Sequence, residues 1–436
     1  MMERKIAIFT LGCRVNHYES AAIADSAREC GFEVVGWDEP ADFGIVNSCA
    51  LTVLAEAKTR QAIRIFARAN PHCAIAVSGC YAQTDPHKIA ELPNVKWVVC
   101  NALKARAAEI IKRYPPAEEP LVLSDSALPA SPEASRGNTP LDDRMNLKIQ
   151  DGCDNACAYC IIPRARGLPR SRAFGDIVRD AENLVSRGVR EIILTGINIA
   201  KFSSPEGGLA GLADRLDKIP ELLRLRLGSI EPPHFELDAL LERMADSSHK
   251  LAPHLHISSQ SLSDNVLAAM RRKYAYAEFA ATLEKIRNKS EYIAVGTDLI
   301  CGHPRETGED FALTKSRLLS SGMAYAHVFT FSPRPKTLAA VMDGQVPAEI
   351  RKARAAELRK AAEEIRSKFA EKNAGKIREV LLENRLANGD YLGYTDNYMQ
   401  VAVNIPQSGL KNRLALVKIA EKIGRGRVAA RLERLL

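Results

Sequence analysis

The chain has 436 residues, of which 46% are hydrophobic and 26% are charged, and its formal net charge is +8. This length predicts two or three domains, and the composition is that of globular chains with real hydrophobic cores. No run approaches roughly eighteen consecutive apolar residues, which excludes an ordinary membrane-spanning helix. The N-terminus has too short an apolar segment for a signal peptide, so we expect a cytoplasmic protein without a membrane partner. Ten cysteines in such a chain indicate metal binding or catalysis before disulfides.

The positive charge is unevenly placed along the chain. Residues 347–436 contain 19 Lys and Arg against 11 Asp and Glu, so this region carries the entire net charge of +8. Such an asymmetry is typical of a region that contacts a polyanion. A solvated basic helix and tail explains the same counts equally well, and the sequence leaves both interpretations open.

Residues 1–113 are predicted to form an α/β domain with a doubly wound sheet. Apolar runs of strand length alternate there with segments of helical spacing. The predicted strands are Ile6–Thr10, Phe43–Asn47, Ala74–Ser78 and Val95–Val99, and the predicted helices between them are Glu19–Cys30 and Val53–Ala69.

Three cysteines of this first domain share one position relative to the predicted strands. Cys13, Cys49 and Cys80 each come just after a strand. The carboxyl ends of parallel strands meet at one edge of a sheet, where open α/β sheets bind ligands. These three thiols are therefore candidate ligands of one metal cluster, although three unrelated core thiols would fit the same pattern. The remaining cysteines of this part, Cys30, Cys73 and Cys100, are better explained as small buried residues.

Residues 114–143 interrupt the alternation. They are rich in Pro, Ser and Ala and show little apolar periodicity. This composition predicts an exposed linker between two domains.

A short loop after the linker carries three further cysteines, Cys153, Cys157 and Cys160, spaced C-x3-C-x2-C. Such a loop can place three thiolates around one iron–sulfur cluster and leave one iron without a protein ligand. An open coordination position is where a substrate or cofactor binds. A zinc knuckle would need a nearby fourth Cys or His, and none follows closely in the sequence. A disulfide pattern would need an even count and an oxidising compartment.

Residues 144–375 are predicted to form a partial (β/α)6 barrel, because a second alternation of strands and helices begins here. Helical spacing appears between the strands, as in Asp176–Ser186 and Asp264–Arg271. The predicted strands are Met145–Gln150, Glu191–Leu194, Arg224–Gly228, His254–Ile257, Ile293–Ile300 and Ala326–Phe331.

Polar residues gather at the carboxyl ends of these strands, where barrel enzymes place their active sites. Thr195, Glu231 and Gln260 stand at these ends, although each could belong to a loop or a helix cap. Cys301 also ends a strand, and burial as a small apolar residue is the better explanation for it. Four arginines follow the cysteine loop, and they fit either contacts to phosphate or carboxylate groups or a solvated run of charge; they are Arg164, Arg166, Arg170 and Arg172.

The last part of the chain is predicted to be a helix followed by a small β-barrel over residues 376–436. Ala348–Asn373 has the mixed charge of an exposed helix. Tyr391, Tyr394 and Tyr398 either stack on unpaired RNA bases or belong to the core of the barrel. The predicted strands are Lys376–Glu383, Asp390–Tyr394, Met399–Asn404 and Leu414–Ile419.

Two sets of motifs resemble a known family. The C-x3-C-x2-C loop, with the aromatic Tyr159 before its third cysteine, resembles the cluster-binding loop of radical S-adenosylmethionine enzymes. Thr10–Asn16, Asn47–Thr52 and Gly79–Gln83 resemble the three signature segments of the methylthiotransferase family, and the C-terminal region resembles its RNA-binding TRAM barrel. The resemblance implies one 4Fe-4S cluster on Cys153, Cys157 and Cys160, and an auxiliary 4Fe-4S cluster on Cys13, Cys49 and Cys80.

The resemblance also implies a reaction. Within the family, the first and third segments look most like the group that converts N6-threonylcarbamoyladenosine at position 37 of tRNA to its 2-methylthio derivative. S-adenosylmethionine would then serve both as methyl donor and as radical source, beside Tyr159, Thr195, Glu231 and Gln260. The alternatives are isopentenyladenosine in tRNA or, less favoured by the basic C-terminus, a ribosomal-protein aspartate.

The partners implied are tRNA and an electron donor such as flavodoxin or ferredoxin, whereas the sulfur source, the oligomeric state and any catalytic acid or base remain unidentified. The residues expected to contact RNA are Arg164, Arg166, Tyr394 and Tyr398.

Two departures from the family pattern lie at the expected cofactor edge. Leu262 stands where glycine is common, and His303-Pro304-Arg305 replaces a more usual Phe-Pro-Gly. Both place the local backbone course in question and leave the cluster ligands unaffected.

Overall fold

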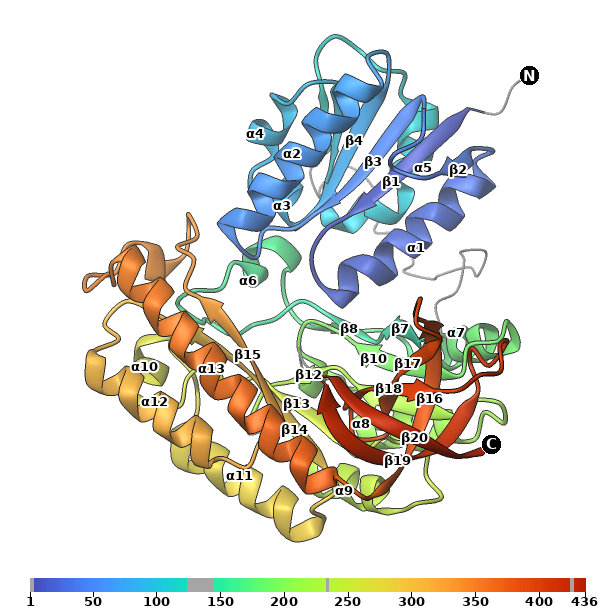
Figure 1. Ribbon diagram of the computed structural model, residues 1–436. Helices are drawn as coiled ribbons and strands as arrows, with labels where there is room; N and C mark the ends of the chain where they lie inside the picture. Colours follow the sequence, from blue (N-terminus) through green and yellow to red (C-terminus); the bar gives the residue numbers. More distant parts are fainter. Residues whose placement is uncertain (1–3, 124–143, 233–234, 424–426) are drawn as a thin grey trace.

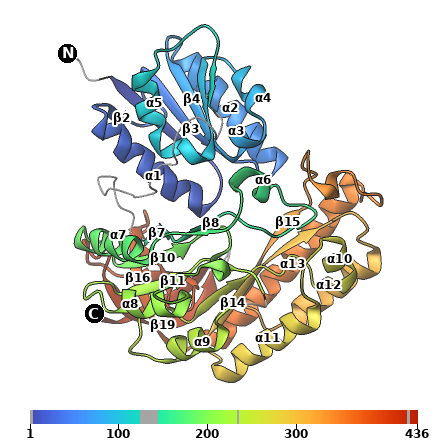
Figure 2. The ribbon, with the colours of Figure 1, turned by 180° about the vertical axis from the view of Figure 1, so that it is seen from behind.

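The computed structural model describes residues 4–123, 144–232, 235–423 and 427–436. An N-terminal α/β domain, a central half-barrel and a small C-terminal β-barrel follow one another along the chain. The N-terminal domain lies over one end of the central strands, and the C-terminal barrel lies beside the first of those strands (Figure 1). The view from behind shows helices α8 to α12 on the outer side of the central unit (Figure 2).

The N-terminal domain is built on one parallel sheet with the strand order β2-β1-β3-β4-β5-β6. Apolar clusters cover both of its faces, which is why its central strands are nearly continuous apolar runs. The strands are β1 (Lys5–Thr10), β2 (Glu33–Val35), β3 (Phe43–Ser48), β4 (Ala74–Gly79), β5 (Val95–Val99) and β6 (Leu121–Leu123). The helices are α1 (Arg14–Glu29), α2 (Val53–Ala69), α3 (Cys80–Thr84), α4 (Pro86–Ala90) and α5 (Ala107–Arg113), with a 3-10 turn η1 (Asn101–Arg106).

The doubly wound α/β fold predicted for this domain is confirmed, and two short strands were missed. Strand β2 pairs with β1, and strand β6 pairs with β5 at the far edge. Strand β6 lies inside the region predicted as a linker, so that prediction was wrong for Leu121–Leu123. Three residues at a sheet edge carry too short a pattern to be recognised, and their pairing with β5 is what orders them. Residues 124–143 of the predicted linker lie outside the described residues.

The central unit contains parallel strands that follow one another in chain order, as predicted for a partial (β/α)6 barrel. Strands β7, β10 and β11 form one hydrogen-bonded sheet, and strands β12 to β15 form a second. The chain passes from the first sheet to the second between β11 and β12. The strands are β7 (Arg144–Lys148), β10 (Glu191–Thr195), β11 (Arg224–Leu227), β12 (Ser229–Ile230), β13 (His254–Ile257), β14 (Ala294–Cys301) and β15 (Tyr325–Thr330). A separate hairpin pairs β8 (Gln150–Asp151) with β9 (Arg170–Ser171).

Helices pack on the outer side of this half-barrel and bury one continuous apolar cluster. Helix α13 was predicted to be exposed, but it packs along β15 and beside α12, where Leu358 and Ile365 are buried. The helices are α6 (Ile162–Arg166), α7 (Phe174–Ser186), α8 (Leu209–Asp217), α9 (Leu237–Ala245), α10 (Asp264–Ala269), α11 (Tyr276–Lys289), α12 (Gly308–Ser320) and α13 (Ala348–Asn373), with 3-10 turns η2 (Ile199–Lys201) and η3 (Leu338–Ala340).

The C-terminal strands close into a barrel with the order β16-β17-β18-β20-β19. The predicted small barrel is confirmed, although its last strand was not recognised from the sequence. The strands are β16 (Ile377–Arg385), β17 (Asp390–Thr395), β18 (Gln400–Asn404), β19 (Leu414–Ile423) and β20 (Arg427–Leu435). Among the described residues, none of the helices has the length and apolarity that crossing a membrane requires.

Buried charges join the N-terminal domain to the half-barrel. Glu19 of α1 accepts hydrogen bonds from Lys104 at 2.7 Å, from Lys148 at 2.8 Å and from Arg166 at 2.9 Å. Asp151 accepts from Lys148 and Arg166 as well. Burial alone raises the pKa of Glu19, but the charges of Arg166, Lys104 and Lys148 hold that pKa well below its ordinary value. We call these five residues the Glu19 network.

A second buried ion pair docks the C-terminal barrel onto the half-barrel. Arg226 on β11 donates to Glu191 on β10 at 2.7 Å. The same guanidinium donates to the backbone oxygens of Thr395 and Asp396, both at 2.7 Å. The two domains therefore share a desolvated charge pair, and removing the C-terminal barrel would uncover it.

Candidate functional site

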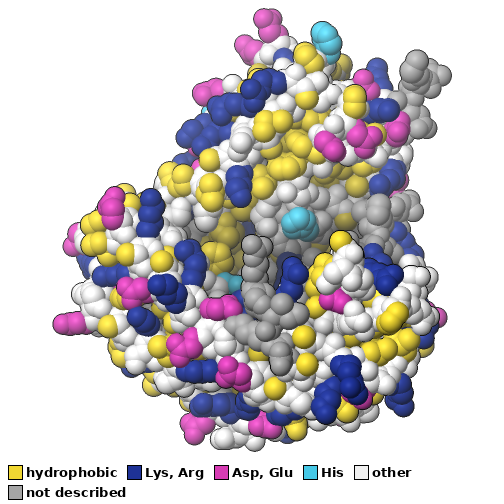
Figure 3. All heavy atoms as spheres, in the orientation of Figure 1, with side chains coloured by type: hydrophobic (Ala, Val, Ile, Leu, Met, Phe, Trp, Pro, Cys, Tyr) yellow, Lys and Arg dark blue, Asp and Glu magenta, His cyan; other side chains and the backbone are white. Residues whose placement is uncertain are grey.

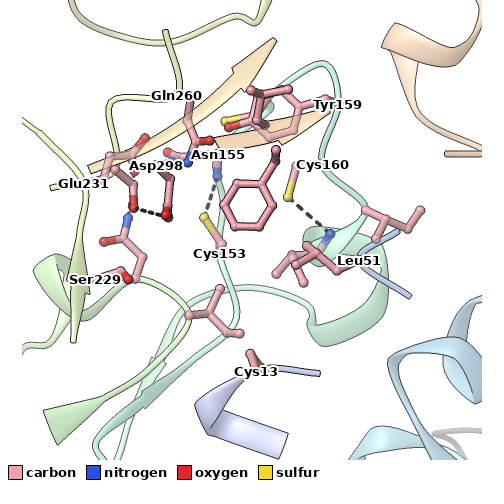
Figure 4. Close-up of a pocket in the computed structure, with 18 of the residues that line it drawn as sticks. Cys13, Leu51, Cys153, Asn155, Tyr159, Cys160, Ser229, Glu231, Gln260 and Asp298 are labelled. Carbon is pink, nitrogen blue, oxygen red and sulfur yellow. Dashed lines mark hydrogen bonds between the residues drawn. The ribbon is translucent and has the colours of Figure 1, made fainter. Parts of the chain in front are cut away.

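A cavity of about 360 Å³ lies between the N-terminal domain and the carboxyl ends of the half-barrel strands. Six cysteines from two domains line it, together with residues that follow several barrel strands. The cysteines are Cys13, Cys49, Cys80, Cys153, Cys157 and Cys160. Cys13 approaches from the N-terminal domain, opposite the loop that carries Cys153 and Cys160 (Figure 4).

The first three cysteines lie where strands of the N-terminal sheet end. Cys13 directly precedes helix α1, Cys49 follows β3, and Cys80 begins helix α3. The sheet order reverses between β1 and β3, and this switch point is where open α/β sheets bind ligands. The predicted convergence of these cysteines at one sheet edge is therefore what the structure contains, while their role as cluster ligands stays a prediction.

Glycines permit the close approach of these thiols. Gly12 has a φ of +113°, and a Cβ atom there would lie 2.9 Å from the Sγ atom of Cys49. Gly79 has a φ of +92°, and a Cβ atom there would lie 2.3 Å from the backbone oxygen of Ser48. Both backbones occupy a region that only glycine adopts at low cost. A side chain at position 12 would displace Cys49, and one at position 79 would push on the backbone of Ser48, directly before Cys49.

The loop from Cys153 to Cys160 is fixed by backbone contacts. The N–H of Cys153 donates to the oxygen of Gly167 at 3.0 Å, and the N–H of Ala158 donates to the oxygen of Met270 at 3.0 Å. Backbone N–H groups also point at the sulfurs, from Asn155 to Cys153 and from Ile162 to Cys160, each at 3.4 Å. Donors of this kind stabilise negative charge on sulfur and are a common feature around iron–sulfur clusters.

Burial governs the protonation of the thiols. It raises the pKa of Cys160 to about 12 and that of Cys49 to about 11, because a thiolate is poorly solvated there. A cation at this position would compensate the buried thiolates and release their protons. Soft thiolate ligands in two sets of three, one set on a single tight loop, fit iron–sulfur clusters.

A buried ionic group stands beside the second cysteine set. Arg272 donates to Glu231 at 2.8 Å and to the Sγ atom of Cys157 at 3.4 Å. Asn198 donates to Glu231 at 2.7 Å, and Asn155 donates to the same carboxylate. Glu231 was predicted from its place after a strand, whereas Arg272 and Asn155 were missed. Their importance is visible only in their contacts across the cavity. In the sequence, Arg272 lies in a short run of basic residues after a helix, and that run alone does not indicate a site.

The other predicted cofactor residues divide into two groups. Tyr159 and Gln260 line the cavity, and Gln260 has a φ of +66° where its backbone bridges to β14. Thr195 is 3% exposed and does not line the cavity, although Gly196 directly after it does. Burial holds the pKa of Tyr159 well above its ordinary value, so its hydroxyl stays protonated. The cofactor roles of these residues stay predictions.

The two departures from the family pattern occupy packed positions. Leu262 is fully buried in the main apolar cluster. His303 is also buried, and its ring packs edge-on against Tyr159, with the centroids 6.2 Å apart. Arg305 has a φ of +70° and forms an exposed ion pair with Asp343. Thus the histidine supports the tyrosine of the cysteine loop.

The prediction that Arg166 contacts RNA is wrong. This side chain is 4% exposed and belongs to the Glu19 network. A charged residue with buried carboxylate partners cannot reach a phosphate backbone without breaking them. Arg172 is likewise held, by Tyr18 and Asp180. Arg164 is exposed, and its predicted contact with RNA stays a prediction.

The three tyrosines of the C-terminal barrel differ in their surroundings. Tyr391 is 2% exposed and belongs to the barrel core. Tyr394 and Tyr398 are partly buried and face the half-barrel, with Arg144 lying 4.1 Å from the ring centre of Tyr394. Tyr398 stacks on His254 with the centroids 4.2 Å apart. They are thus neither core residues of the small barrel nor free stacking platforms, but part of the domain junction.

The cysteines expected to be structural lie away from the cavity. Cys100 and Cys73 are buried within apolar clusters on opposite faces of the N-terminal sheet. Cys301 is 1% exposed and its thiol donates to the backbone oxygen of Phe329. Cys30 is partly buried at the end of α1. None of these four lines the cavity described above.

The fold and the cysteine pattern define a class, and comparisons with known proteins agree with it. Residues 147–318 match the radical SAM superfamily, and residues 5–100 match an uncharacterised protein family, UPF0004. A radical S-adenosylmethionine methyltransferase, TsrM from Kitasatospora setae, shares the fold with a TM-score of 0.55 and 16% identity, over 78% of this chain and 74% of that one. The chain is therefore a radical SAM enzyme with an N-terminal α/β domain.

Sequence relatives identify the family. The threonylcarbamoyladenosine tRNA methylthiotransferase MtaB of Bacillus subtilis is 36% identical over 91% of this chain and 89% of that protein. The enzyme of the same name from Aquifex aeolicus is 34% identical over 95% of this chain and 99% of that protein. A tRNA-2-methylthio-N(6)-dimethylallyladenosine synthase from Anaeromyxobacter is 34% identical over 90% of this chain and 86% of that protein. The chain belongs to the tRNA methylthiotransferase family, and within it to the MtaB type.

Proposed function

We propose that the protein adds a methylthio group to C2 of N6-threonylcarbamoyladenosine in tRNA. The observation that carries this proposal is the convergence of six cysteines from two domains on one cavity, in a chain of the MtaB type. The reaction needs two kinds of chemistry at one place, because a carbon–hydrogen bond must be broken and a sulfur atom must be delivered to the same carbon. Two cysteine sets facing one cavity meet that need.

The proposed ligands are Cys153, Cys157 and Cys160 for one 4Fe-4S cluster and Cys13, Cys49 and Cys80 for the second. When bound, the clusters and S-adenosylmethionine supply the radical, the sulfur atom and the methyl group. The protein's own residues position these groups. The N–H donors of the cysteine loop stabilise charge on sulfur, and the glycines at positions 12 and 79 hold the second set close.

The remaining cavity residues are proposed to orient S-adenosylmethionine and exclude water. Arg272 bonds to both Glu231 and the thiol of Cys157, so these side chains are held at the wall of the cavity. Tyr159 closes one side, supported by His303. Apolar side chains such as Ile161, Ile300 and Phe331 line the same cavity and leave little room for bulk water around a reactive radical.

The C-terminal barrel is proposed to contact tRNA phosphates through its outer face. Lys418 and Arg431 are exposed and lie directly opposite each other on β19 and β20. Like charges directly opposite each other destabilise a sheet. Binding to an anionic partner such as tRNA would explain why both residues are basic. Lys and Arg side chains gather at the lower right of the molecule, over the strands of this barrel (Figure 3). The reductant is proposed to be a flavodoxin or ferredoxin in the cytoplasm.

Two alternative substrates are less well supported. An N6-dimethylallyl substituent is apolar, and the Anaeromyxobacter relative named for it is 34% identical to this chain, against 36% for the MtaB of Bacillus subtilis. A ribosomal-protein aspartate would not need the basic C-terminal region. Mass analysis of nucleosides decides between them. The reduced, cluster-loaded protein and S-adenosylmethionine are incubated with tRNA that carries N6-threonylcarbamoyladenosine, and the 2-methylthio derivative is expected. Product from isopentenyladenosine tRNA alone would overturn the proposal.

A further inference from the structure

A row of polar side chains crosses one face of the last three half-barrel strands. His254 and His256 lie on β13, Asp298 on β14, and Tyr325 and His327 on β15. The hydroxyl of Tyr325 lies 2.9 Å from Nε2 of His254 and 3.0 Å from Nδ1 of His256. Nε2 of His256 in turn lies 3.1 Å from Oδ2 of Asp298. The row is therefore a continuous hydrogen-bonded chain that the cluster ligands do not use.

This row ends in a compact group of three side chains beside the cysteine cavity. The nitrogen and oxygen atoms of His256, Asp298 and His327 lie within 4.8 Å of one another. Asp298 lines the large cavity with the cysteines, and His327 lines a second cavity of about 180 Å³ near Tyr398. We call these three residues the His256 cluster. The cluster thus has one residue lining each of the two cavities.

The surroundings of the cluster are positively charged. Arg14, which directly follows Cys13, donates to the hydroxyl of Tyr398 at 2.9 Å. Burial lowers the pKa of His327, the nearby charges of His256, Arg366 and Arg14 lower it further, and the Asp298 carboxylate raises it. Burial alone raises the pKa of Asp298, but the hydrogen bond from His256 holds that pKa below its ordinary value. An anion placed beside His327 would thus meet two arginines and one carboxylate that is already bonded.

We propose that the His256 cluster and Arg14 form the subsite for the carboxylate-bearing N6 substituent of the target nucleoside. The inference rests on the proposed function and names the residues that set its specificity. The carboxylate accepts hydrogen bonds from His327 and Arg14, and the hydroxyl and N–H groups of the substituent donate to Asp298. The adenine ring then lies in the large cavity, beside the cysteines. His327 and Arg14 are exposed in the free protein. An apolar dimethylallyl group packed against them would displace their water without offering a hydrogen-bond partner, which a binding site disfavours.

A metal ion is the competing occupant, because two histidines and a carboxylate form a common metal-ligand set. Two observations favour the nucleoside. Both ring nitrogens of His256 already have partners, Tyr325 and Asp298, and a metal would have to break the second contact. Arg14 and Arg366 also place positive charge near the site, which opposes a cation.

The test uses the full-length, cluster-loaded protein and three anticodon stem-loop RNAs that differ only at the target adenosine. One carries N6-threonylcarbamoyladenosine, one carries its methyl ester, and one carries unmodified adenosine. Affinity is measured by anaerobic fluorescence anisotropy. The native protein should bind the first RNA about tenfold or more tightly than the other two, since a charge-assisted hydrogen bond is lost. His327→Gln and Arg14→Gln should reduce this ratio towards one. His72→Gln, an exposed histidine of the N-terminal domain, should retain the native ratio.

Each result bears on the inference. Equal affinity of the native protein for acid and ester overturns it, even if the variants fail to fold. An unchanged ratio in His327→Gln overturns it as well. A metal equivalent beyond the clusters, lost in His327→Gln while the ratio persists, assigns the site to a metal instead. Failure of the proposed function is seen separately, as absence of the 2-methylthio product from the native enzyme, and the binding ratio remains measurable in that case.

Discussion

Replacing Glu19 with glutamine should destabilise the N-terminal domain by about 3–5 kcal/mol, because it breaks a buried ion pair and leaves cations unpaired. Glu19 is 6% exposed and faces Lys104, Lys148 and Arg166. With the carboxylate gone, only Asp151 offsets the three positive charges of the network. The amide of glutamine keeps one acceptor and adds donors that point at other donors.

The assay is urea unfolding followed by tryptophan fluorescence. Both tryptophans of the chain, Trp37 and Trp97, lie in the N-terminal domain, so the signal reports on that domain. Glu119→Gln, an exposed glutamate of the same domain, is the matched control and should change stability by less than about 0.5 kcal/mol. A loss below about 1 kcal/mol in Glu19→Gln, or an equal loss in the control, would refute the reasoning.

The pH dependence of this effect has a defined sign. The folded-state pKa of Glu19 lies well below the ordinary value of 4.5. The carboxylate therefore contributes stability that is fully present above pH 4.5 and is lost as the pH falls through the folded-state pKa. The difference between native protein and Glu19→Gln should shrink as the pH is lowered from 5 towards 3. A difference that grows on acidification would contradict the assignment.

Four further outcomes are expected. Cys157→Ala should abolish 5′-deoxyadenosine release under dithionite, and substantial release would remove it from the ligand set. Cys49→Ala should lose about half of the bound iron and retain detectable cofactor cleavage. Cys100→Ala is the control and should bind as much iron as the native protein; the reverse pattern would reassign the second site. Gly12→Ala should cost about 1–2 kcal/mol and lower iron retention, since its Cβ would meet the thiol of Cys49. Lys418→Gln should reduce the magnitude of the log–log salt slope of tRNA binding by about 0.9, and an unchanged slope would place the phosphates elsewhere.

Point substitutions on the outer face of the C-terminal barrel test RNA binding better than removal of the barrel. Deletion of residues 376–436 would expose Arg226 and Glu191, whose buried pair is completed by backbone oxygens of the barrel. Loss of tRNA binding in such a truncation would then have two causes. Tyr398→Ala carries the same ambiguity, because Tyr398 stacks on His254 of the half-barrel.

Local pattern determined most of the elements of this fold. Helix α2 begins and ends where the apolar spacing predicts, from Val53 to Ala69. Helix α13 has the bounds that its composition and mixed charge predict, from Ala348 to Asn373. Buried parallel strands read as continuous apolar runs, so their positions were evident without the structure. The cysteine loop is a contiguous motif, and the rule that ligands gather at the carboxyl ends of parallel strands placed Cys13, Cys49 and Cys80 at one edge.

Tertiary structure alone decided which polar residues serve the site and which serve the fold. Arg166 belongs to a motif that looks like a phosphate contact, yet burial against Glu19 makes it a link between domains. Arg272, 115 positions from Cys157, reaches its thiol only because the chain folds back across the cavity. His256, Asp298 and His327 stand on three different strands, and no spacing in the sequence relates them. Hydrophobic periodicity indicates which face of a helix or strand a residue lies on. It does not indicate which residue packs against that face, because this depends on elements far apart in the chain.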